Sequence, residues 1–148
     1  MKRRREREFA LRVLFAHEFN PVPIYQQIEN LNAEFRKFDT QFARSIIDIY
    51  TDNKEHLDRR IETHLINWDF GRLAIMDRVL LRMALVEFLY MEDIPPEVTI
   101  NEIIEISKMY STDKSSRFVN GMLDAILKKL IENKEIVKSG RGLISNIE

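Results

Sequence analysis

Cysteine is absent from the 148 residues of this chain. Its absence excludes a disulfide framework, a thiol nucleophile and a thiolate metal site. Glycine and proline are scarce, with four of each, so there are few points at which a helix would have to break. Aliphatic residues, Phe, Glu, Lys and Arg are frequent instead, a composition that favours helices over sheets.

Long apolar segments are also missing. The first apolar segment, FALRVLFA, is interrupted by Arg12 and followed by His17 and Glu18, which excludes a secretory signal peptide. No window approaches the roughly 18 apolar residues that a membrane-spanning helix requires. We therefore expect a cytoplasmic protein with no membrane partner. At 148 residues, 45% of them hydrophobic, the chain suits one domain with a buried core.

Helical periodicity accounts for nearly the whole chain, and no segment alternates as a strand does. The fold class predicted is all-α, a compact single-domain bundle of about six to seven helices. Residues 1–134 form the domain, and residues 135–148 form a C-terminal tail that is expected to be flexible and dispensable. The Thr-x-x-Glu pattern at Thr99–Glu102 predicts a capping box that opens the fifth helix. The predicted helices cover residues 4–19, 23–38, 40–66 with a bend near 51–53, 73–91, 99–110 and 114–133.

Patterns typical of enzymes are not found. The four glycines stand apart at positions 71, 121, 140 and 142, so no phosphate-binding loop is formed. The histidines His17, His56 and His64 do not have metal-ligand spacing, and the serine pair Ser115-Ser116 has no nearby histidine. We therefore expect no catalytic residue, no metal and no cofactor.

Positive charge is concentrated at the start of the chain. Residues 2–7, here called the basic arm, contain one acid, Glu6, and the five basic residues Lys2, Arg3, Arg4, Arg5 and Arg7, although the whole chain has a formal net charge of -1. A helix N-terminus favours acids, because the helix dipole is positive there. Stability therefore does not explain the arm, whereas a phosphate-bearing partner does. The alternative is a solvated helix end, which accounts for most runs of charge.

A second group of residues with nucleic-acid chemistry lies in the segment from Ser111 to Gly121. Lys114 and Arg117 can contact phosphates, and Phe118 can stack on a base, a mixture that suits single-stranded RNA. The alternative interpretation makes Phe118 the first core residue of the last helix. Both hold if Phe118 lies at the rim of the core.

Four motifs resemble the NusB family of bacterial transcription antitermination factors. They cover roughly residues 3–130 in the family's order. The motifs are Arg3-Arg4-Arg5 with Glu8-Phe9-Ala10-Leu11, Asp77-Arg78 with Leu81-Arg82-x-Ala84-x-x-Glu87, Val98-Thr99-Ile100-Asn101-Glu102, and Phe118-Val119-Asn120-Gly121-Met122-Leu123-Asp124.

This resemblance implies a non-enzymatic, all-helical protein that pairs with the ribosomal protein NusE. The pair would bind boxA, a short single-stranded RNA element of ribosomal RNA leaders, and help RNA polymerase, with NusA and NusG, to read through terminators. It further implies RNA contacts for Arg3, Arg4, Arg5 and Arg7, and also for Arg82, Arg117 and Phe118. Residues implied to face NusE are Phe15, Asp77 and Glu87. Lys114 stands where the family often has an acid or amide, and Lys2 extends the arm.

Other possibilities stay open at this point. The chain could be a protein–protein scaffold whose acidic surface binds a basic partner without RNA. It could also be a stand-alone relative of the RNA-binding domain of ribosomal RNA cytosine-5 methyltransferases, although no segment here resembles their catalytic domain. A homodimer that covers the basic arm is a further possibility.

Overall fold

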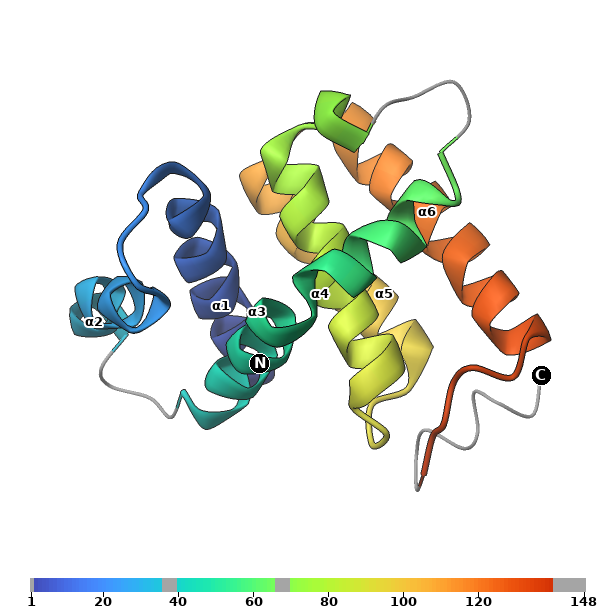
Figure 1. The fold of residues 1–148 in the computed structure, drawn as a ribbon, viewed down its shortest axis with the longest axis horizontal. Coiled ribbons are helices and arrows are strands. Elements are labelled where there is room, and N and C mark those ends of the chain that lie inside the picture. The colour runs from blue at the N-terminus through green and yellow to red at the C-terminus, as the bar shows by residue number, and fades with distance from the viewer. Residues whose placement is uncertain (1, 36–39, 66–69, 140–148) are drawn as a thin grey trace.

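The computed structural model describes residues 2–35, 40–65 and 70–139, and within these ranges it contains helices and no strands. The all-α prediction is therefore confirmed (Figure 1). The elements are α1 (Lys2–Phe19), α2 (Ile24–Phe35), α3 (Gln41–Glu62), a short 3-10 turn η1 (Phe70–Arg72), α4 (Ile75–Tyr90), α5 (Pro96–Tyr110) and α6 (Asp113–Glu132). The predicted ends of the second and third helices, at 38 and 66, lie outside the described residues.

Helix α4 is the centre of the bundle. It packs against α1, α3, α5 and α6, and Figure 1 shows it running through the middle of the molecule. Its apolar residues from Val79 to Phe88 are fully buried, as expected for a helix that is apolar on nearly all sides. Because α4 also carries the buried polar residues Asp77, Arg82 and Glu87, the core must supply partners for their charges.

Helix α3 bends where the sequence predicts it. Asn53 has non-helical dihedral angles (φ -126°, ψ 16°) within an otherwise continuous helix. Its side-chain Nδ2 donates a 2.8 Å hydrogen bond to the carbonyl of Ile49, four residues earlier. The side chain thus takes an acceptor that the helical backbone normally uses, which is a known cause of helix bending.

Helix α5 begins earlier than predicted. It starts at Pro96, where the missing backbone N–H costs nothing, and Thr99 lies inside the helix. The predicted capping box is wrong, because the Thr99 hydroxyl donates a 2.8 Å hydrogen bond to Glu87 of α4 and does not cap α5.

The segment after α6 folds back onto the bundle. Lys138 is only 4% exposed, and its Nζ donates to the carbonyl oxygens of Glu87 and Met91, at 2.9 and 2.8 Å. Glu135 forms an ion pair with Arg60 of α3. Residues 135–139 therefore pack on the domain, which corrects the predicted start of a loose tail at residue 135. The rest of the predicted tail, 140–148, lies outside the described residues.

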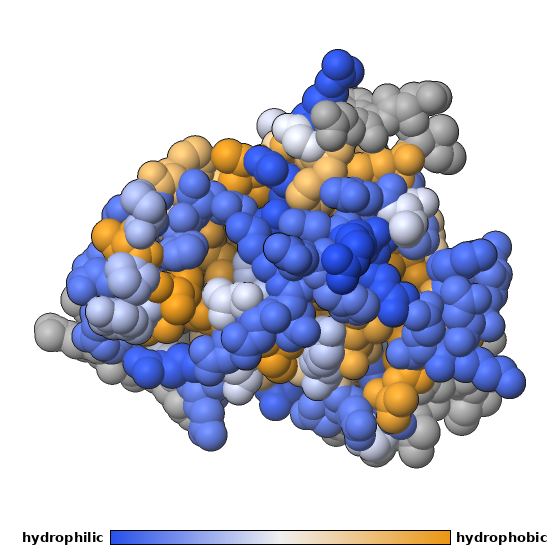
Figure 2. All heavy atoms as spheres, viewed as in Figure 1, coloured by the Kyte–Doolittle hydropathy of each residue, from blue (hydrophilic) through white to orange (hydrophobic). Residues whose placement is uncertain are grey.

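The visible surface is mostly hydrophilic, with separate apolar patches (Figure 2). Among the described residues, no helix is long and apolar enough to cross a membrane.

Candidate nucleic-acid interface

The basic arm forms the first turns of α1, and no acid stands in its first turn. Successive residues of a helix point in different directions, so the five basic side chains cannot share one face. Lys2, Arg3 and Arg5 are exposed, Arg4 is partly buried, and Arg7 is buried. The structure therefore divides the arm into residues that face solvent and residues that hold α1 to the bundle.

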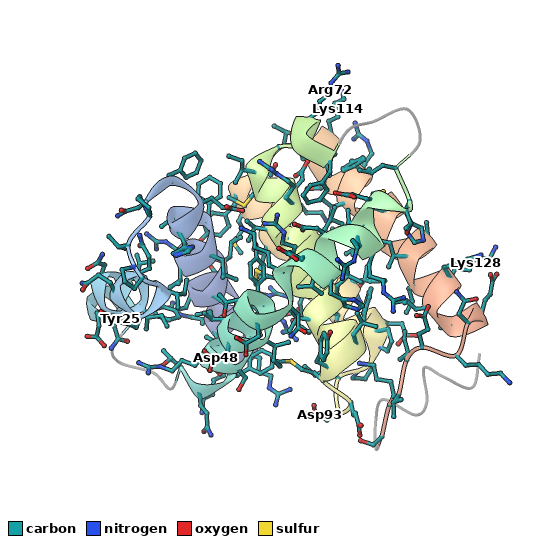
Figure 3. All side chains as sticks on the ribbon, in the orientation of Figure 1. Tyr25, Asp48, Arg72, Asp93, Lys114 and Lys128 are labelled. Carbon is teal, nitrogen blue, oxygen red and sulfur yellow. The ribbon has the colours of Figure 1, made fainter. Side chains whose placement is uncertain are left out.

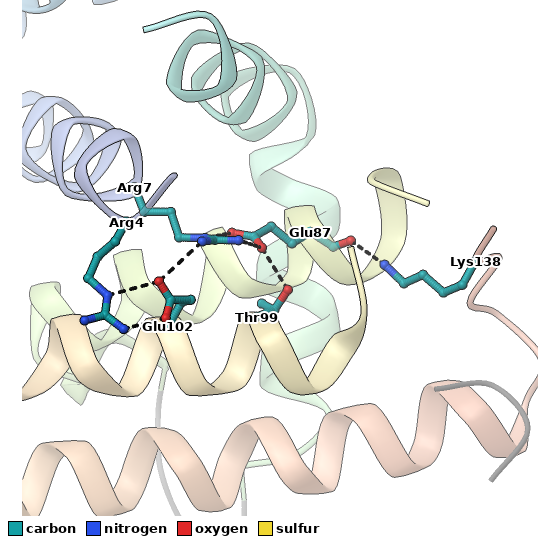
Figure 4. Close-up of polar contacts among 6 residues, drawn as sticks. All are labelled: Arg4, Arg7, Glu87, Thr99, Glu102 and Lys138. Carbon is teal, nitrogen blue, oxygen red and sulfur yellow. Dashed lines mark hydrogen bonds and ion pairs between the residues drawn. The ribbon is translucent and has the colours of Figure 1, made fainter. Parts of the chain in front are cut away.

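Arg7 belongs to the interior. Its Nε and Nη2 each donate a 2.8 Å hydrogen bond to the carboxylate of Glu87, and the two side chains are 2% and 0% exposed (Figure 4). Thr99 donates a further hydrogen bond to the same carboxylate. The predicted RNA contact at Arg7 and the predicted NusE contact at Glu87 are corrected here, since neither side chain reaches the surface. The two residues join α1 to α4.

Arg4 pairs with a carboxylate nearer the surface. Its Nε and Nη2 donate to Glu102 of α5 at 3.0 and 2.6 Å, a two-point contact between a guanidinium and a carboxylate. The hydrogen bond from Arg4 holds the pKa of Glu102 below its usual value. Arg4 is thus partly exposed, but its guanidinium is already paired with the Glu102 carboxylate.

Arg3 lies at the edge of the arm. Its Nη2 is 3.6 Å from the carboxylate of Asp93, and its guanidinium lies 4.4 Å from the centre of the Phe42 ring.

Glu6 of the arm accepts hydrogen bonds from the backbone N–H groups of Phe42 and Ala43, at 2.9 and 3.2 Å. Because Glu6 caps the N-terminus of α3, that helix end is occupied by a carboxylate of the chain itself.

The second predicted group lies at the start of α6. Thr112 caps the helix, since its hydroxyl accepts a 3.0 Å hydrogen bond from the backbone N–H of Ser115. Lys114 and Arg117 are exposed, whereas Phe118 is partly buried and packs against the core. Phe118 thus lies at the rim of the core, where its ring can pack against the core and also stack on an RNA base.

A cavity of about 210 Å³ is lined both by residues predicted to contact RNA and by one predicted to face NusE. Asp77, predicted to face NusE, and Lys114 and Phe118, predicted to contact RNA, all line it. Figure 3 shows Arg72, which also lines it, beside Lys114 at one end of the molecule. Asp77 is 5% exposed and its Oδ1 has no hydrogen-bond partner. Burial raises the pKa of Asp77, against the lowering effect of a hydrogen bond with Ser115.

Arg82 is buried in a polar network and does not border the surface. It donates to Asp58 at 2.6 and 3.1 Å, to Glu18 at 2.7 Å and to the Tyr50 hydroxyl at 2.9 Å. Arg82 is 2% exposed and offers no surface to an RNA phosphate, so its predicted RNA contact is corrected. Its hydrogen bonds instead join α4 to α1 and α3.

Phe15, predicted to face NusE, is only partly buried. Its ring meets that of Phe19 edge to face, with 5.1 Å between the centroids, and Phe19 is 63% exposed. The aromatic pair gives the end of α1 an apolar surface, which leaves Phe15 accessible in part to a protein partner.

Helix α5 links the surroundings of the two predicted RNA-binding groups. Figure 3 shows Asp93, which pairs with Arg3, at the opposite end of the molecule from Lys114. Helix α5 spans this distance, because it begins next to Asp93 and ends at Tyr110, just before the loop that leads to α6. The Tyr110 hydroxyl donates a 3.2 Å hydrogen bond to Glu8 of α1. The start of α1 therefore lies along α5, through Arg4 and Glu102 and through Glu8 and Tyr110, and α5 leads from there to the start of α6.

Sequence patterns do not point to two residues beside these groups, Phe42 and Tyr110, and they give Glu102 a capping role only. Phe42 and Tyr110 are aromatics next to residues of α1, and Glu102 neutralises Arg4. No local pattern reveals these contacts, since each joins residues that are distant in the chain. The described residues contain no group of three or more His, Cys, Asp and Glu side chains that could hold a metal ion.

Comparison with known proteins identifies the family. The family model of NusB matches residues 4–128. The Transcription antitermination protein NusB of Chloroherpeton thalassium is 42% identical over 147 residues, which cover 97% of this chain and 70% of the relative.

Solved structures agree with this result. A structure of T. maritima NusB is 40% identical with a TM-score of 0.80, covering 87% of this chain and 92% of that one. A chain from a crystal structure of the antitermination factors NusB and NusE in complex with dsRNA is 26% identical with a TM-score of 0.78, covering 87% of this chain and 99% of that one. The family predicted from the four motifs is thereby confirmed, and the chain belongs to the NusB family.

Proposed function

We propose that this protein is an RNA-binding transcription antitermination factor. It binds a boxA-like single strand of the ribosomal RNA leader together with the ribosomal protein NusE, and acts in the cytoplasm on RNA polymerase with NusA and NusG. The observation that carries this proposal is the family match together with a structural neighbour solved with NusE and RNA. It acts by binding and not by catalysis.

The exposed basic residues support this function. Lys2, Arg3 and Arg5 at the start of α1, and Lys114 and Arg117 at the start of α6, are exposed and offer phosphate contacts. Phosphate contacts carry no sequence information, so base preference must come from residues such as Phe118. The cavity that Asp77 lines, and the partly exposed Phe15, form the proposed NusE surface.

Fluorescence anisotropy tests the proposal. A labelled boxA-like RNA and a scrambled RNA are each titrated with the protein, with and without purified NusE. We expect NusE to tighten binding of the boxA-like strand only. We also expect the logarithm of affinity to fall with the logarithm of salt concentration by about 0.7 per neutralised phosphate. Absence of RNA binding in all four titrations would contradict the proposal.

A scaffold without RNA contact is the second candidate, and the pairing of Arg3, Arg4 and Arg7 with acids favours it. In that case Asp77→Lys abolishes NusE binding and activity, whereas Lys2→Ala with Arg5→Ala leaves both unchanged. The RNA-binding function requires the second variant to weaken RNA binding.

A further inference from the structure

Three arginines of the basic arm, Arg3, Arg4 and Arg7, each meet a carboxylate, and the three pairs differ in depth. Exposure of the two side chains is 52% and 68% in Arg3–Asp93, 27% and 20% in Arg4–Glu102, and 2% and 0% in Arg7–Glu87. An ion pair open to solvent is weak and exchanges its partners readily, whereas a buried pair is costly to break. The arm therefore passes from exchangeable to permanent pairs along little more than one helical turn.

We infer that Asp93 and Glu102 are affinity-determining residues of this protein, because they occupy the guanidinium groups of Arg3 and Arg4 and an RNA phosphate must displace them. The inference rests on the proposed function in that it takes a polyanion to be the ligand of the arm. It concerns how strongly the arm holds phosphate, which the family match does not address.

The structure leaves each displaced carboxylate with a second cation. Glu102 Oε1 lies 3.7 Å from Nη1 of Arg7, so the carboxylate keeps a positive neighbour after Arg4 leaves (Figure 4). Lys138 Nζ donates to the carbonyl oxygen of Met91 at 2.8 Å, two residues before Asp93, so Asp93 keeps a positive charge in its neighbourhood when Arg3 leaves. The exchange therefore leaves no carboxylate without a nearby positive charge, which lowers its cost.

The other acids of this region have different roles. Glu6 is 3% exposed and accepts the backbone N–H groups at the start of α3. Glu87 is fully buried with Arg7 and Thr99. Neither competes with a phosphate at the surface. The competition is assigned to Asp93 and Glu102 because these two carboxylates form the ion pairs of Arg3 and Arg4.

The test compares Glu102→Gln with a matched control, Glu105→Gln. Both changes remove one negative charge from α5, but Glu105 forms its ion pair with Lys108 and acts on Arg4 only through its charge, less strongly than Glu102 does. Anisotropy is measured with the boxA-like and scrambled RNA strands over a range of salt. Because a partly exposed ion pair contributes about 0.2–1 kcal/mol, Glu102→Gln should bind both RNAs about 1.4- to five-fold more tightly than Glu105→Gln does. The salt slope should steepen by about 0.7, the value for one further phosphate on a single strand.

A double-mutant cycle separates competition from a general loss of charge. In a chain that already carries Arg4→Gln, the further change Glu102→Gln should leave RNA affinity unchanged, because no guanidinium is released. If Glu102→Gln weakens binding, or if it tightens binding equally in the presence of Arg4→Gln, the inference is overturned. Asp93→Asn, at an exposed position, repeats the test without disturbing the α1–α5 contact, and an effect no larger than that of Glu105→Gln would also overturn it.

These measurements distinguish failure of the inferred competition from failure of the proposed boxA recognition. If the wild-type protein prefers neither RNA while Glu102→Gln tightens both, boxA recognition fails and the competition stands. If the wild-type protein prefers the boxA-like strand while Glu102→Gln has no effect, boxA recognition stands and the competition fails.

Discussion

Arg7 and Glu87, 80 residues apart in the chain, form a two-point ion pair at hydrogen-bond distances of 2.8 Å within the core. Both side chains are almost entirely shielded from water. The pair attaches the first helix to the central helix, and it takes one arginine of the basic arm out of contact with solvent.

Breaking this pair should destabilise the protein strongly. Arg7→Met leaves the Glu87 carboxylate buried without its cation, and we expect a loss of about 3–5 kcal/mol in the free energy of unfolding. Urea denaturation measures it, with Arg3→Ala as the control, which should cost less than about 1 kcal/mol because its ion pair is exposed. The combination Arg7→Met with Glu87→Leu should cost less than Arg7→Met alone, and a larger loss would contradict this account.

The buried Lys138 amine should make stability depend on pH. Burial lowers its pKa to about 8, from an ordinary value of 10.5. Between these values the unfolded chain binds the proton and the folded chain does not, so the contribution of Lys138 to the free energy of unfolding rises with pH.

Lys138→Met provides the reference for this pH dependence. The difference in free energy of unfolding, wild type minus variant, should be greater at about pH 10 than at about pH 7. Urea denaturation at both pH values measures it. A difference that stays constant or falls would show that the amine does not lose its proton in this range.

Gly121 should limit the stability of α6. It lies within the helix at an exposed position, and a Cβ built on it meets no atom within 4 Å. Gly121→Ala should therefore raise the free energy of unfolding by about 1 kcal/mol, because glycine is the poorer helix former. Thermal unfolding measures this, and the reverse change at exposed Ala125 of the same helix should lower stability by a similar amount. Loss of stability in Gly121→Ala would show that the glycine is required by the fold.

Phe118 should have separate effects on stability and on RNA preference. Phe118→Ala removes both the core contact and the ring, and because the residue is only partly buried its cost should fall below the roughly 3–5 kcal/mol of a fully buried phenylalanine. Phe118→Leu keeps an apolar side chain but cannot stack on a base. We expect Phe118→Leu to keep most of the stability and to reduce the preference for boxA-like over scrambled RNA in anisotropy titrations. An unchanged preference would contradict the stacking role.

Helix positions could be predicted well because they depend on local patterns. The bend at Asn53 and the central place of α4 both follow from residues close together in the chain. The start of α5 was predicted wrongly for the same reason. Thr99 and Glu102 have the spacing of a capping box, but their side chains are taken by Glu87 and Arg4, which lie on other helices.

The exposure of the candidate site residues could be predicted only in part. Their charge predicts that Lys114, Arg117, Arg7 and Arg82 lie at the surface. Lys114 and Arg117 are indeed exposed, whereas Arg7 and Arg82 are buried. An arginine that contacts solvent and one that pairs with a core carboxylate look alike in a sequence, because the partner is far away in the chain.

The sequence by itself determined the helical class, the lack of thiol chemistry and the membership of the NusB family, since each depends on composition or on motifs of neighbouring residues. Only the tertiary structure decided which arginines of the arm face solvent. That choice depends on Arg4 meeting Glu102, 98 residues away, and Arg7 meeting Glu87, 80 residues away. The energy of an ion pair depends on distance and burial, and both are properties of the folded chain.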